Sequence, residues 1–287
     1  MREFHYRIGW RVSGHRPGFH RSTGAGPGFE FQGHAALFDL PDARKLDLHA
    51  TLRDPSGLWQ VRVHRQRASI PVILLADLSA SMGALTGAGG AGKMQVLADF
   101  TASLAYSAHR TGDTFAFIGC DEVMRDDYLL SSTRVQGAGI ALAEKLRAAQ
   151  PTGRNAIALF DAAAALTERR SLVFLASDFH FPLSLLEQIL RALARHEVVP
   201  VVIWDKAELQ PVTRFGLATI RDSESGGRRT LLLRKKLRER INAAYLARRA
   251  ELSAAFIRHA LRPVYFSGDF DADKMTAHFH GALATTA

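Results

Sequence analysis

A ten-residue stretch, Val72 to Ser81 with the sequence VILLADLSAS, constrains the fold more than any other part of the chain. Its first half is an uninterrupted apolar run, too short for a buried helix and typical of a strand buried on both faces. The run stops at a carboxylate, Asp77, which is followed by hydroxyls at alternate positions, Ser79 and Ser81. A loop with a side-chain period near two would turn these three side chains to one side. Small oxygen ligands at the end of a buried strand suit a hard cation, whereas a helix cap, the alternative, needs only one such residue.

The pattern D-x-S-x-S after an apolar strand resembles the metal-ion-dependent adhesion site of von Willebrand factor A domains. Three further segments, RKLDLHA at 44–50, WQVRVHRQ at 59–66 and SLVFLASDF at 171–179, resemble the MoxR-associated subgroup of that class, domain of unknown function family 58. The resemblance extends over nearly the whole chain. It implies a partner of the MoxR-type AAA+ ATPase class and a client protein that presents an Asp or Glu to the metal.

Strand and helix patterns alternate along the rest of the chain. We expect buried or half-buried strands at 72–76, 114–119, 123–130, 172–176, 198–204 and 263–266, with helices at 94–110, 135–149, 152–166, 182–196, about 234–260 and 271–283. This alternation predicts an α/β fold, a doubly wound, mostly parallel six-stranded sheet of the von Willebrand factor A or Rossmann-like type. If the strand order is 3-2-1-4-5-6, the first and fourth strands are neighbours at the switch point, where ligands bind. Asp77 and Asp178 then meet at one crevice, and we expect Asp178 to orient the inner ligands through a water.

A fifth ligand is expected from the loop before the helix at 152–166. The resembled domains present a Thr in a Gly-Thr-x-Leu pattern. Here Ile157 takes the place of the Leu, which puts Asn155 at the ligand position and leaves Thr152 as its rival three residues earlier. An Asn oxygen can bind a hard cation, and it can equally cap a helix. The predicted metal ligands are therefore Asp77, Ser79, Ser81, Asp178 and Asn155 or Thr152, and the expected ion is Mg2+ or Mn2+.

The glycine-rich segment 87–93 formally matches G-x-x-x-x-G-K of a phosphate-binding loop. Met94 stands where that loop needs Ser or Thr, and the segment begins ten residues after its strand ends. We therefore interpret it as a loop before a helix rather than a nucleotide site.

Composition divides the chain into an extension and a main domain. We expect residues 1–68 to form an N-terminal, partly irregular extension with a strand near 59–66. The resemblance implies that residues 69–287 form a von Willebrand factor A-like domain, in which we expect a β-hairpin insertion at 206–233. The Gly- and Arg-rich part, 1–33, is not expected to form a regular helix or a long strand. No apolar run is long enough for a membrane helix, and no signal peptide is recognisable, so we expect a cytoplasmic protein. The single cysteine, Cys120, follows an apolar run and is expected to be packed rather than reactive.

The net charge of +9 and the pI near 10.1 make nucleic acid or an acidic partner a candidate. Residues 228–262 hold eleven Lys and Arg against two Glu. Apolar residues at helical spacing run down one side of the same segment, so we interpret the charged side as the solvated face of a helix. No aromatic residues alternate with the basic ones in the way that would support a nucleic-acid surface. We expect a non-enzymatic, metal-dependent protein-binding module. The alternatives are a magnesium-dependent hydrolase, which lacks a second Asp two residues after Asp77, and nucleic-acid binding through 228–262.

Overall fold

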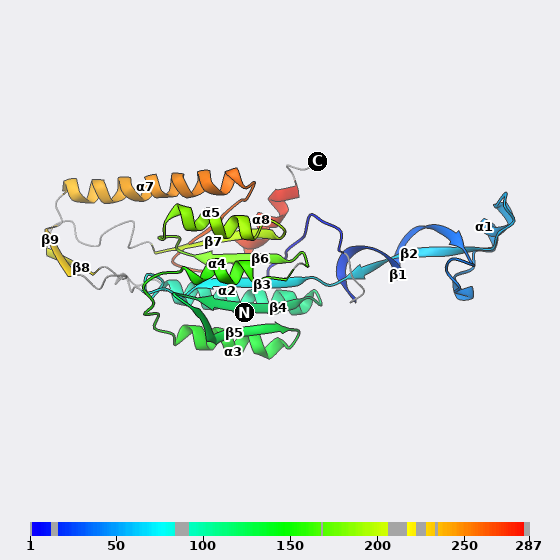
Figure 1. Ribbon diagram of the computed structural model, residues 1–287, viewed down its shortest axis with the longest axis horizontal. Coiled ribbons are helices and arrows are strands. Elements are labelled where there is room, and N and C mark those ends of the chain that lie inside the picture. The colour runs from blue at the N-terminus through cyan, green and yellow to red at the C-terminus, as the bar shows by residue number, and fades with distance from the viewer. Residues whose placement is uncertain are drawn as a thin grey trace. The chain divides into compact units, whose positions relative to one another are not determined.

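The computed structural model describes residues 2–12, 17–83, 92–167, 169–205, 217–221, 228–232 and 235–283. The chain divides into two compact units (Figure 1). Unit 1 comprises residues 1–7, 71–110 and 114–287, and unit 2 comprises residues 8–70 and 111–113.

The centre of unit 1 is a six-stranded sheet with the order β10-β7-β6-β3-β4-β5. Its strands are β3 (Pro71–Asp77), β4 (Thr114–Cys120), β5 (Met124–Thr133), β6 (Leu172–Ser177), β7 (Glu197–Trp204) and β10 (Val264–Ser267). All neighbours are parallel except β4 and β5, which pair antiparallel at one edge. Counted in chain order this is 3-2-1-4-5-6, so the predicted mostly parallel sheet and its switch point between β3 and β6 are confirmed.

Helices cover both faces of this sheet, as a doubly wound fold requires (Figure 1). They are α2 (Lys93–Arg110), α3 (Gln136–Arg147), α4 (Ala158–Ala164), α5 (Leu183–Ala192), α7 (Lys235–Arg258) and α8 (Ala272–Leu283). On one face, Leu75 of β3 and Leu175 of β6 share a buried cluster with α4, α5 and the end of α7. On the other face the ring of Phe174 contacts Phe100 of α2 and Phe279 of α8. Successive residues of one strand, such as Phe174 and Leu175, thus pack into opposite layers of the core.

The first residues of the chain belong to unit 1. Phe4 is 1% exposed, and its ring lies 6.1 Å from that of Phe100 and 6.3 Å from that of Phe174. The backbone N–H of Phe4 donates to the Ser107 hydroxyl of α2 at 3.1 Å. The chain therefore starts in unit 1, builds unit 2, and returns to unit 1 at β3.

Unit 2 is built on an antiparallel pair of strands, β1 (Pro17–Ala36) and β2 (Gln60–Ala68). Between them lie the 3-10 helix η1 (Ala43–Lys45) and α1 (Leu48–Arg53), which Asp47 caps through the N–H of Ala50. The expectation of no long strand within 1–33 is wrong, because β1 has 20 residues. Four register shifts along β1 accommodate its Gly- and Pro-rich sequence, since a bulge lets extra residues leave the ladder without ending the strand.

The predicted hairpin insertion is present in the described residues as an antiparallel pair, β8 (Leu217–Arg221) and β9 (Arg228–Leu232). The predicted turn at 225–227 lies outside the described residues. Cys120 is buried, and burial together with the charge of Asp77 raises the pKa of its thiol to about 12. It is therefore packed, as predicted. None of the described helices is both long and apolar enough to cross a bilayer.

Candidate metal centre

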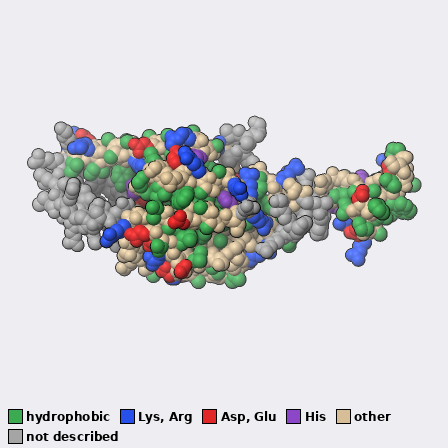
Figure 2. All heavy atoms as spheres, in the orientation of Figure 1, with side chains coloured by type: hydrophobic (Ala, Val, Ile, Leu, Met, Phe, Trp, Pro, Cys, Tyr) green, Lys and Arg blue, Asp and Glu red, His purple; other side chains and the backbone are tan. Residues whose placement is uncertain are grey.

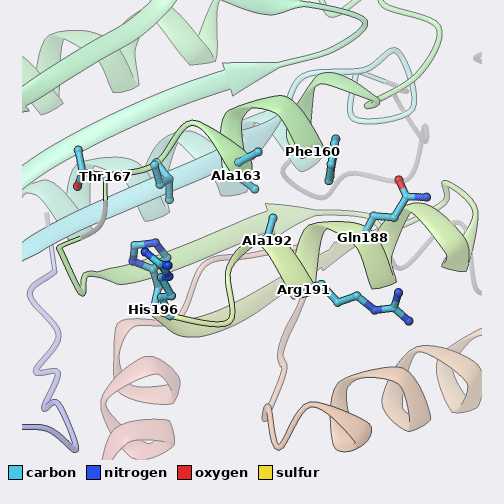
Figure 3. A pocket seen from close by; sticks show the side chains of 10 residues that line it. Phe160, Ala163, Thr167, Gln188, Arg191, Ala192 and His196 are labelled. Atoms are coloured by element: carbon cyan, nitrogen blue, oxygen red, sulfur yellow. The ribbon is translucent and has the colours of Figure 1, made fainter.

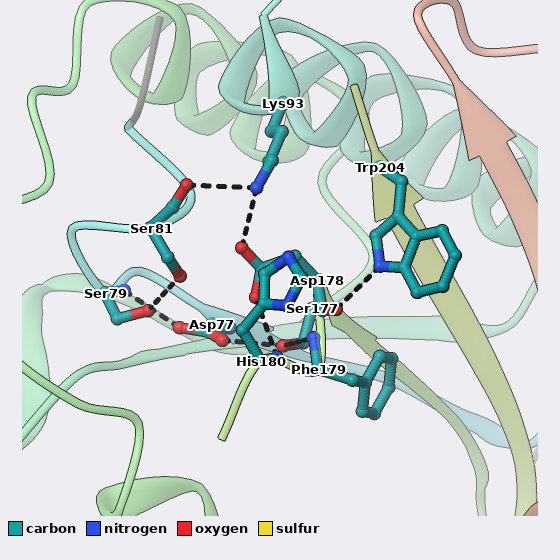
Figure 4. A network of polar contacts seen from close by, with 9 residues as sticks. All are labelled: Asp77, Ser79, Ser81, Lys93, Ser177, Asp178, Phe179, His180 and Trp204. Atoms are coloured by element: carbon teal, nitrogen blue, oxygen red, sulfur yellow. Dashed lines mark hydrogen bonds and ion pairs between the residues drawn. The ribbon is translucent and has the colours of Figure 1, made fainter. Parts of the chain in front are cut away.

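The loop that follows β3 brings its two serine hydroxyls together. Asp77 is 1% exposed and Ser79 2% exposed, at the carboxyl end of a strand buried on both faces. One Asp77 carboxylate oxygen accepts the N–H of Ser79 at 2.8 Å, which turns the chain sharply after the strand. The Oγ atoms of Ser79 and Ser81 lie 3.1 Å apart (Figure 4). Two hydroxyls and a carboxylate thus gather within one turn of chain.

The neighbouring strand, β6, delivers the second carboxylate. Ser177, its last residue, donates its hydroxyl to the other Asp77 oxygen at 2.6 Å, so the two strand ends are bonded directly. Asp178 follows and is 1% exposed. We call Asp77, Ser79, Ser81 and Asp178 the β3–β6 site. The sheet order brings these four predicted residues together although their sequence positions span about a hundred residues.

The backbone after Asp178 is fixed in an unusual conformation. Phe179 has a φ of 54°, in the left-handed region that non-glycine residues rarely adopt. Three hydrogen bonds hold the turn: Phe179 N–H to Ser177 Oγ at 2.8 Å, His180 N–H to Asp178 Oδ1 at 3.2 Å, and Trp204 Nε1–H to the Asp178 carbonyl at 2.8 Å. Such strain persists only where the surroundings over-determine the backbone. Here the result is a carboxylate aimed at the loop after β3 (Figure 4).

Lys93, the first residue of α2, completes the group and was not predicted. Its Nζ donates to Asp178 Oδ2 at 2.8 Å and to the Ser81 carbonyl at 3.2 Å, and the side chain is only 2% exposed (Figure 4). In the sequence Lys93 is the last residue of the segment that formally matches a phosphate-binding loop, of which residues 87–91 lie outside the described residues. A signal was present, because Lys93 shares the i, i+3, i+4, i+7 spacing of the buried residues Val96, Leu97 and Phe100.

The two carboxylates of the site differ in their affinity for a proton. Burial first, and then the charge of Asp178, raises the pKa of Asp77 to about 6, against hydrogen bonds from Ser177 and Ser79. Burial also favours the neutral form of Asp178, but the nearby charges of Lys93 and His180 and the bonds from Lys93 and Ser81 outweigh it and lower that pKa. With both carboxylates ionised, Lys93 balances one charge and leaves the other uncompensated.

The loop at 151–155 lies beside the β3–β6 site and contacts it through its backbone. The carbonyl of Gly153 accepts the N–H of Ala80 at 2.7 Å. A Cβ on Gly153 would come within 2.4 Å of the Asp121 Cβ, so only glycine fits this approach. Thr152 and Asn155 are exposed, and Asn155 Oδ1 accepts the N–H of Ile157 at 3.1 Å just before α4. This is a local turn bond rather than a helix cap, because the N-cap position of α4 is Ile157, and the helix begins at Ala158 rather than near 152.

The chemistry of the site fits a hard cation. Its donors are carboxylate and hydroxyl oxygens only, the ligand types that Mg2+ and Mn2+ prefer. Asp77 carries a buried negative charge that no described cation balances. Throughout the described ranges, no group of three or more His, Cys, Asp or Glu side chains is arranged to hold a metal. A cation here would therefore depend on Ser79 and Ser81 as well as on the two carboxylates.

A separate cavity of about 530 Å³ lies between α4 and α5 (Figure 3). Its wall is apolar at Phe160, Ala163 and Ala192 and polar at Arg191 and His196. His196 precedes β7 and accepts the N–H of Ser171, which precedes β6, at 3.2 Å. The cavity is therefore at the amino ends of the strands, opposite the β3–β6 site, and shares no residue with it.

Comparison with known proteins shows which family the chain matches. The model of the family described as "Protein of unknown function DUF58" matches residues 41–251. The chain is 34% identical over 99 residues to an "Uncharacterized protein in moxR 3'region" of Paracoccus denitrificans, a match that covers 34% of this chain and 94% of the relative.

The chain also matches solved structures at low sequence identity, including the following two. The first is the conserved hypothetical protein BatB from Bacteroides thetaiotaomicron, at 14% identity and a TM-score of 0.45 over 76% of this chain and 100% of that one. The second is the SpRpn10 VWA domain, at 12% identity and a TM-score of 0.39 over 72% of this chain and 94% of that one.

Proposed function

The chain belongs to the DUF58 family, and on this premise and the geometry at the ends of β3 and β6 we propose that it is a non-enzymatic, metal-dependent protein-binding module. The observation that carries the proposal is the convergence of the β3–β6 site at the carboxyl ends of two adjacent parallel strands. Asp77, Ser79, Ser81 and Asp178 would hold Mg2+ or Mn2+. The bound ion would supply a coordination position open to the carboxylate of a partner.

The chain's own residues prepare the site for such a ligand. Ser177 and the N–H of Ser79 hold the Asp77 carboxylate in place, and the strained turn at Phe179 orients Asp178. Their burial keeps bulk water from competing for the oxygens. Recognition of an Asp or Glu then requires no chemical step by this chain.

We propose a MoxR-type AAA+ ATPase as the partner class, with a client protein that presents an Asp or Glu. The support is the name of the Paracoccus denitrificans relative, which places that protein in the moxR 3' region, together with the resemblance of the Asp77 motif to a metal-dependent adhesion site. A cytoplasmic location follows from this partner class and belongs to the same proposal.

The test is thermal unfolding of the wild type and Asp77→Ala in chelator, in Mg2+ and in Mn2+. A cation that binds only the folded state should raise the stability of the wild type, by about 2.7 kcal/mol at a hundred times its Kd. Asp77→Ala should show no response, because the central carboxylate is gone. Asp126→Ala, which removes an exposed carboxylate on β5, is the matched control and should respond like the wild type.

A wild type that neither Mg2+ nor Mn2+ stabilises would contradict metal dependence. If the response is present, capture of a nucleotide-free MoxR-type ATPase by the immobilised chain, with and without metal, tests the partner class. Capture that is equal in chelator would show that the partner uses another surface.

A further inference from the structure

The charged side chain of Lys93 occupies a position that is unfavourable for a cation. Lys93 is the first residue of α2, and a cation at a helix amino terminus is opposed by the helix dipole. Its side chain is also almost fully buried, at 2% exposure, and burial of a charge is unfavourable unless a partner compensates it. The Asp178 carboxylate at 2.8 Å and the Ser81 carbonyl at 3.2 Å offset these costs.

Lys93 therefore interacts with the same residues that would hold a metal. Asp178 Oδ2 is one of the four carboxylate oxygens available to a cation at the β3–β6 site. Ser81 supplies its carbonyl to Lys93 and its hydroxyl to the pair with Ser79. Figure 4 shows the lysine reaching from α2 toward these groups, on the side where the carboxylate of Asp178 faces the serines.

We propose that Lys93 is the resident counter-cation of the β3–β6 site, and that a divalent cation has to displace its ammonium group from Asp178 to use that carboxylate. This inference rests on the proposed function and deepens it, because Lys93 then determines how tightly the site holds metal. With Lys93 in place the site presents a net charge of minus one from its two carboxylates. Without it the charge is minus two, which a divalent cation balances fully.

The test is Mn2+ binding, measured by the loss of the free Mn2+ electron paramagnetic resonance signal, for the wild type and Lys93→Met. Methionine keeps the length and packing of the stem and removes the charge. An opposite or like charge within a few ångströms shifts ionic equilibria by about one to three powers of ten. Lys93→Met should therefore bind Mn2+ about tenfold or more tightly than the wild type. Lys274→Met, an exposed lysine on α8, should leave the affinity unchanged.

Stability gives a second readout, because Lys93→Met leaves Asp178 buried without its partner. In chelator the variant should melt below the wild type, and Mn2+ should raise its melting temperature by more than it raises that of the wild type. The double variant Lys93→Met with Asp178→Asn removes both charges. It should recover the melting temperature in chelator and lose the gain in Mn2+ affinity.

The outcomes separate this inference from the proposed function. Equal Mn2+ affinity of the wild type and Lys93→Met, both abolished by Asp77→Ala, would overturn the role of Lys93 and leave the metal site standing. Binding of Mn2+ by Lys93→Met and not by the wild type would support the role of Lys93 and contradict the proposed metal dependence of the wild-type protein. A Lys93→Met protein that Mn2+ neither binds nor stabilises would overturn the role of Lys93, whether or not that protein folds in chelator.

Discussion

Single residues at the β3–β6 site show how placement alone gives two identical side chains different properties. Asp77 and Asp178 are equally buried, yet the pKa of the first is raised to about 6 and that of the second is lowered. The two pKa values differ because the ammonium group of Lys93 forms an ion pair with Asp178. Asp77 receives only neutral donors, Ser177 and the N–H of Ser79. An asymmetric pair of this kind offers one carboxylate with an unbalanced charge to an incoming cation.

His196 gives a prediction about pH at the same scale. Its Nδ1 accepts the N–H of Ser171, so the folded state holds the neutral ring. Burial first, and then the charges of Arg195 and Arg170, lowers the pKa of His196 below 6.5. Between that lowered value and 6.5 the unfolded chain binds a proton that the folded chain does not. Stability from this residue is therefore complete above pH 6.5 and is lost as the pH falls.

We predict that His196→Asn flattens the fall in stability between about pH 6.5 and pH 5, measured by urea unfolding across that range. The Asn oxygen can replace Nδ1 as the acceptor and does not titrate. His280→Asn, an exposed histidine on α8, should retain the wild-type dependence. A His196→Asn protein with the unchanged slope would show that another group is responsible.

Residues of the β3–β6 site could be predicted from the sequence where a local pattern indicated them. The alternation of Asp77, Ser79 and Ser81 and the strand-end position of Asp178 identified four members of the site. The spacing of Lys93 with Val96 and Leu97 indicates that it lies on the buried face of α2, but its partner Asp178 is 85 residues away and cannot be deduced from that spacing. The ligand role of Asn155 rests on the resemblance to a family pattern and stays a prediction; in the structure its side-chain oxygen accepts the N–H of Ile157.

Among the elements, α7 is better understood as a support for the turn after β6 than as a basic surface. Arg248 donates to the carbonyls of Phe179, at 2.8 Å, and Phe181, and Phe256 packs its ring 5.4 Å from that of Phe179. Arg258 and His259 are both bonded to Glu187 of α5. On the face drawn in Figure 2, Lys and Arg side chains lie among Asp and Glu side chains rather than in one band. In the described part of α7, the basic residues either bond to neighbouring elements or lie on the solvated face that the sequence predicts.

We predict that Arg248→Ala destabilises unit 1 by about 1–3 kcal/mol, the cost of removing charged hydrogen bonds from carbonyls that are partly buried. The loss should concentrate at the turn, so the amides of Phe179 and His180 should exchange hydrogen faster than in the wild type. Arg240→Ala, on an exposed position of the same helix, should change neither stability nor exchange. Equal effects of the two substitutions would mean that α7 acts through its general charge.

The elements were predicted well where periodicity was strong and poorly where it was broken. Buried runs such as Leu172–Ser177 allowed the strands to be placed to within a residue or two. The β1 strand was missed because its glycines and prolines mark turns in most contexts. Pairing with β2 overrides that preference, and the register shifts that make it possible depend on the partner strand rather than on the local sequence.

At the scale of the whole molecule, the order of strands determines where chemistry can occur. Strands β4 and β5 extend the sheet on one side of β3, and β6, β7 and β10 extend it on the other, which creates the switch point at Asp77. The alternation of strands and helices predicts a doubly wound sheet, and the assumed order 3-2-1-4-5-6 is the observed one. This alternation gave no indication that residues 1–7 belong to unit 1, because seven residues carry too little periodicity to be assigned.

We predict that Phe4→Ala lowers the free energy of unfolding of unit 1 by about 3–5 kcal/mol, because it removes a fully buried ring that contacts Phe100 and Phe174. Urea unfolding followed by the near-ultraviolet signal measures the change. Phe38→Ala is the matched control, since the Phe38 ring is 96% exposed in unit 2. A similar loss in both variants would argue against a core role for the amino-terminal segment.

The spacing of the bonded residues along the chain has a consequence during synthesis. Asp77 leaves the ribosome 100 residues before Ser177, and Lys93 leaves it 85 residues before Asp178. Strands β3, β4 and β5 can pair while β6 is still being made, but the carboxylate at their edge then lacks its hydroxyl donor and the lysine lacks its counter-charge. Trp204, which holds the Asp178 carbonyl, arrives later still. The β3–β6 site can therefore reach its complete hydrogen-bonded form only after synthesis has passed Trp204, the last residue of β7.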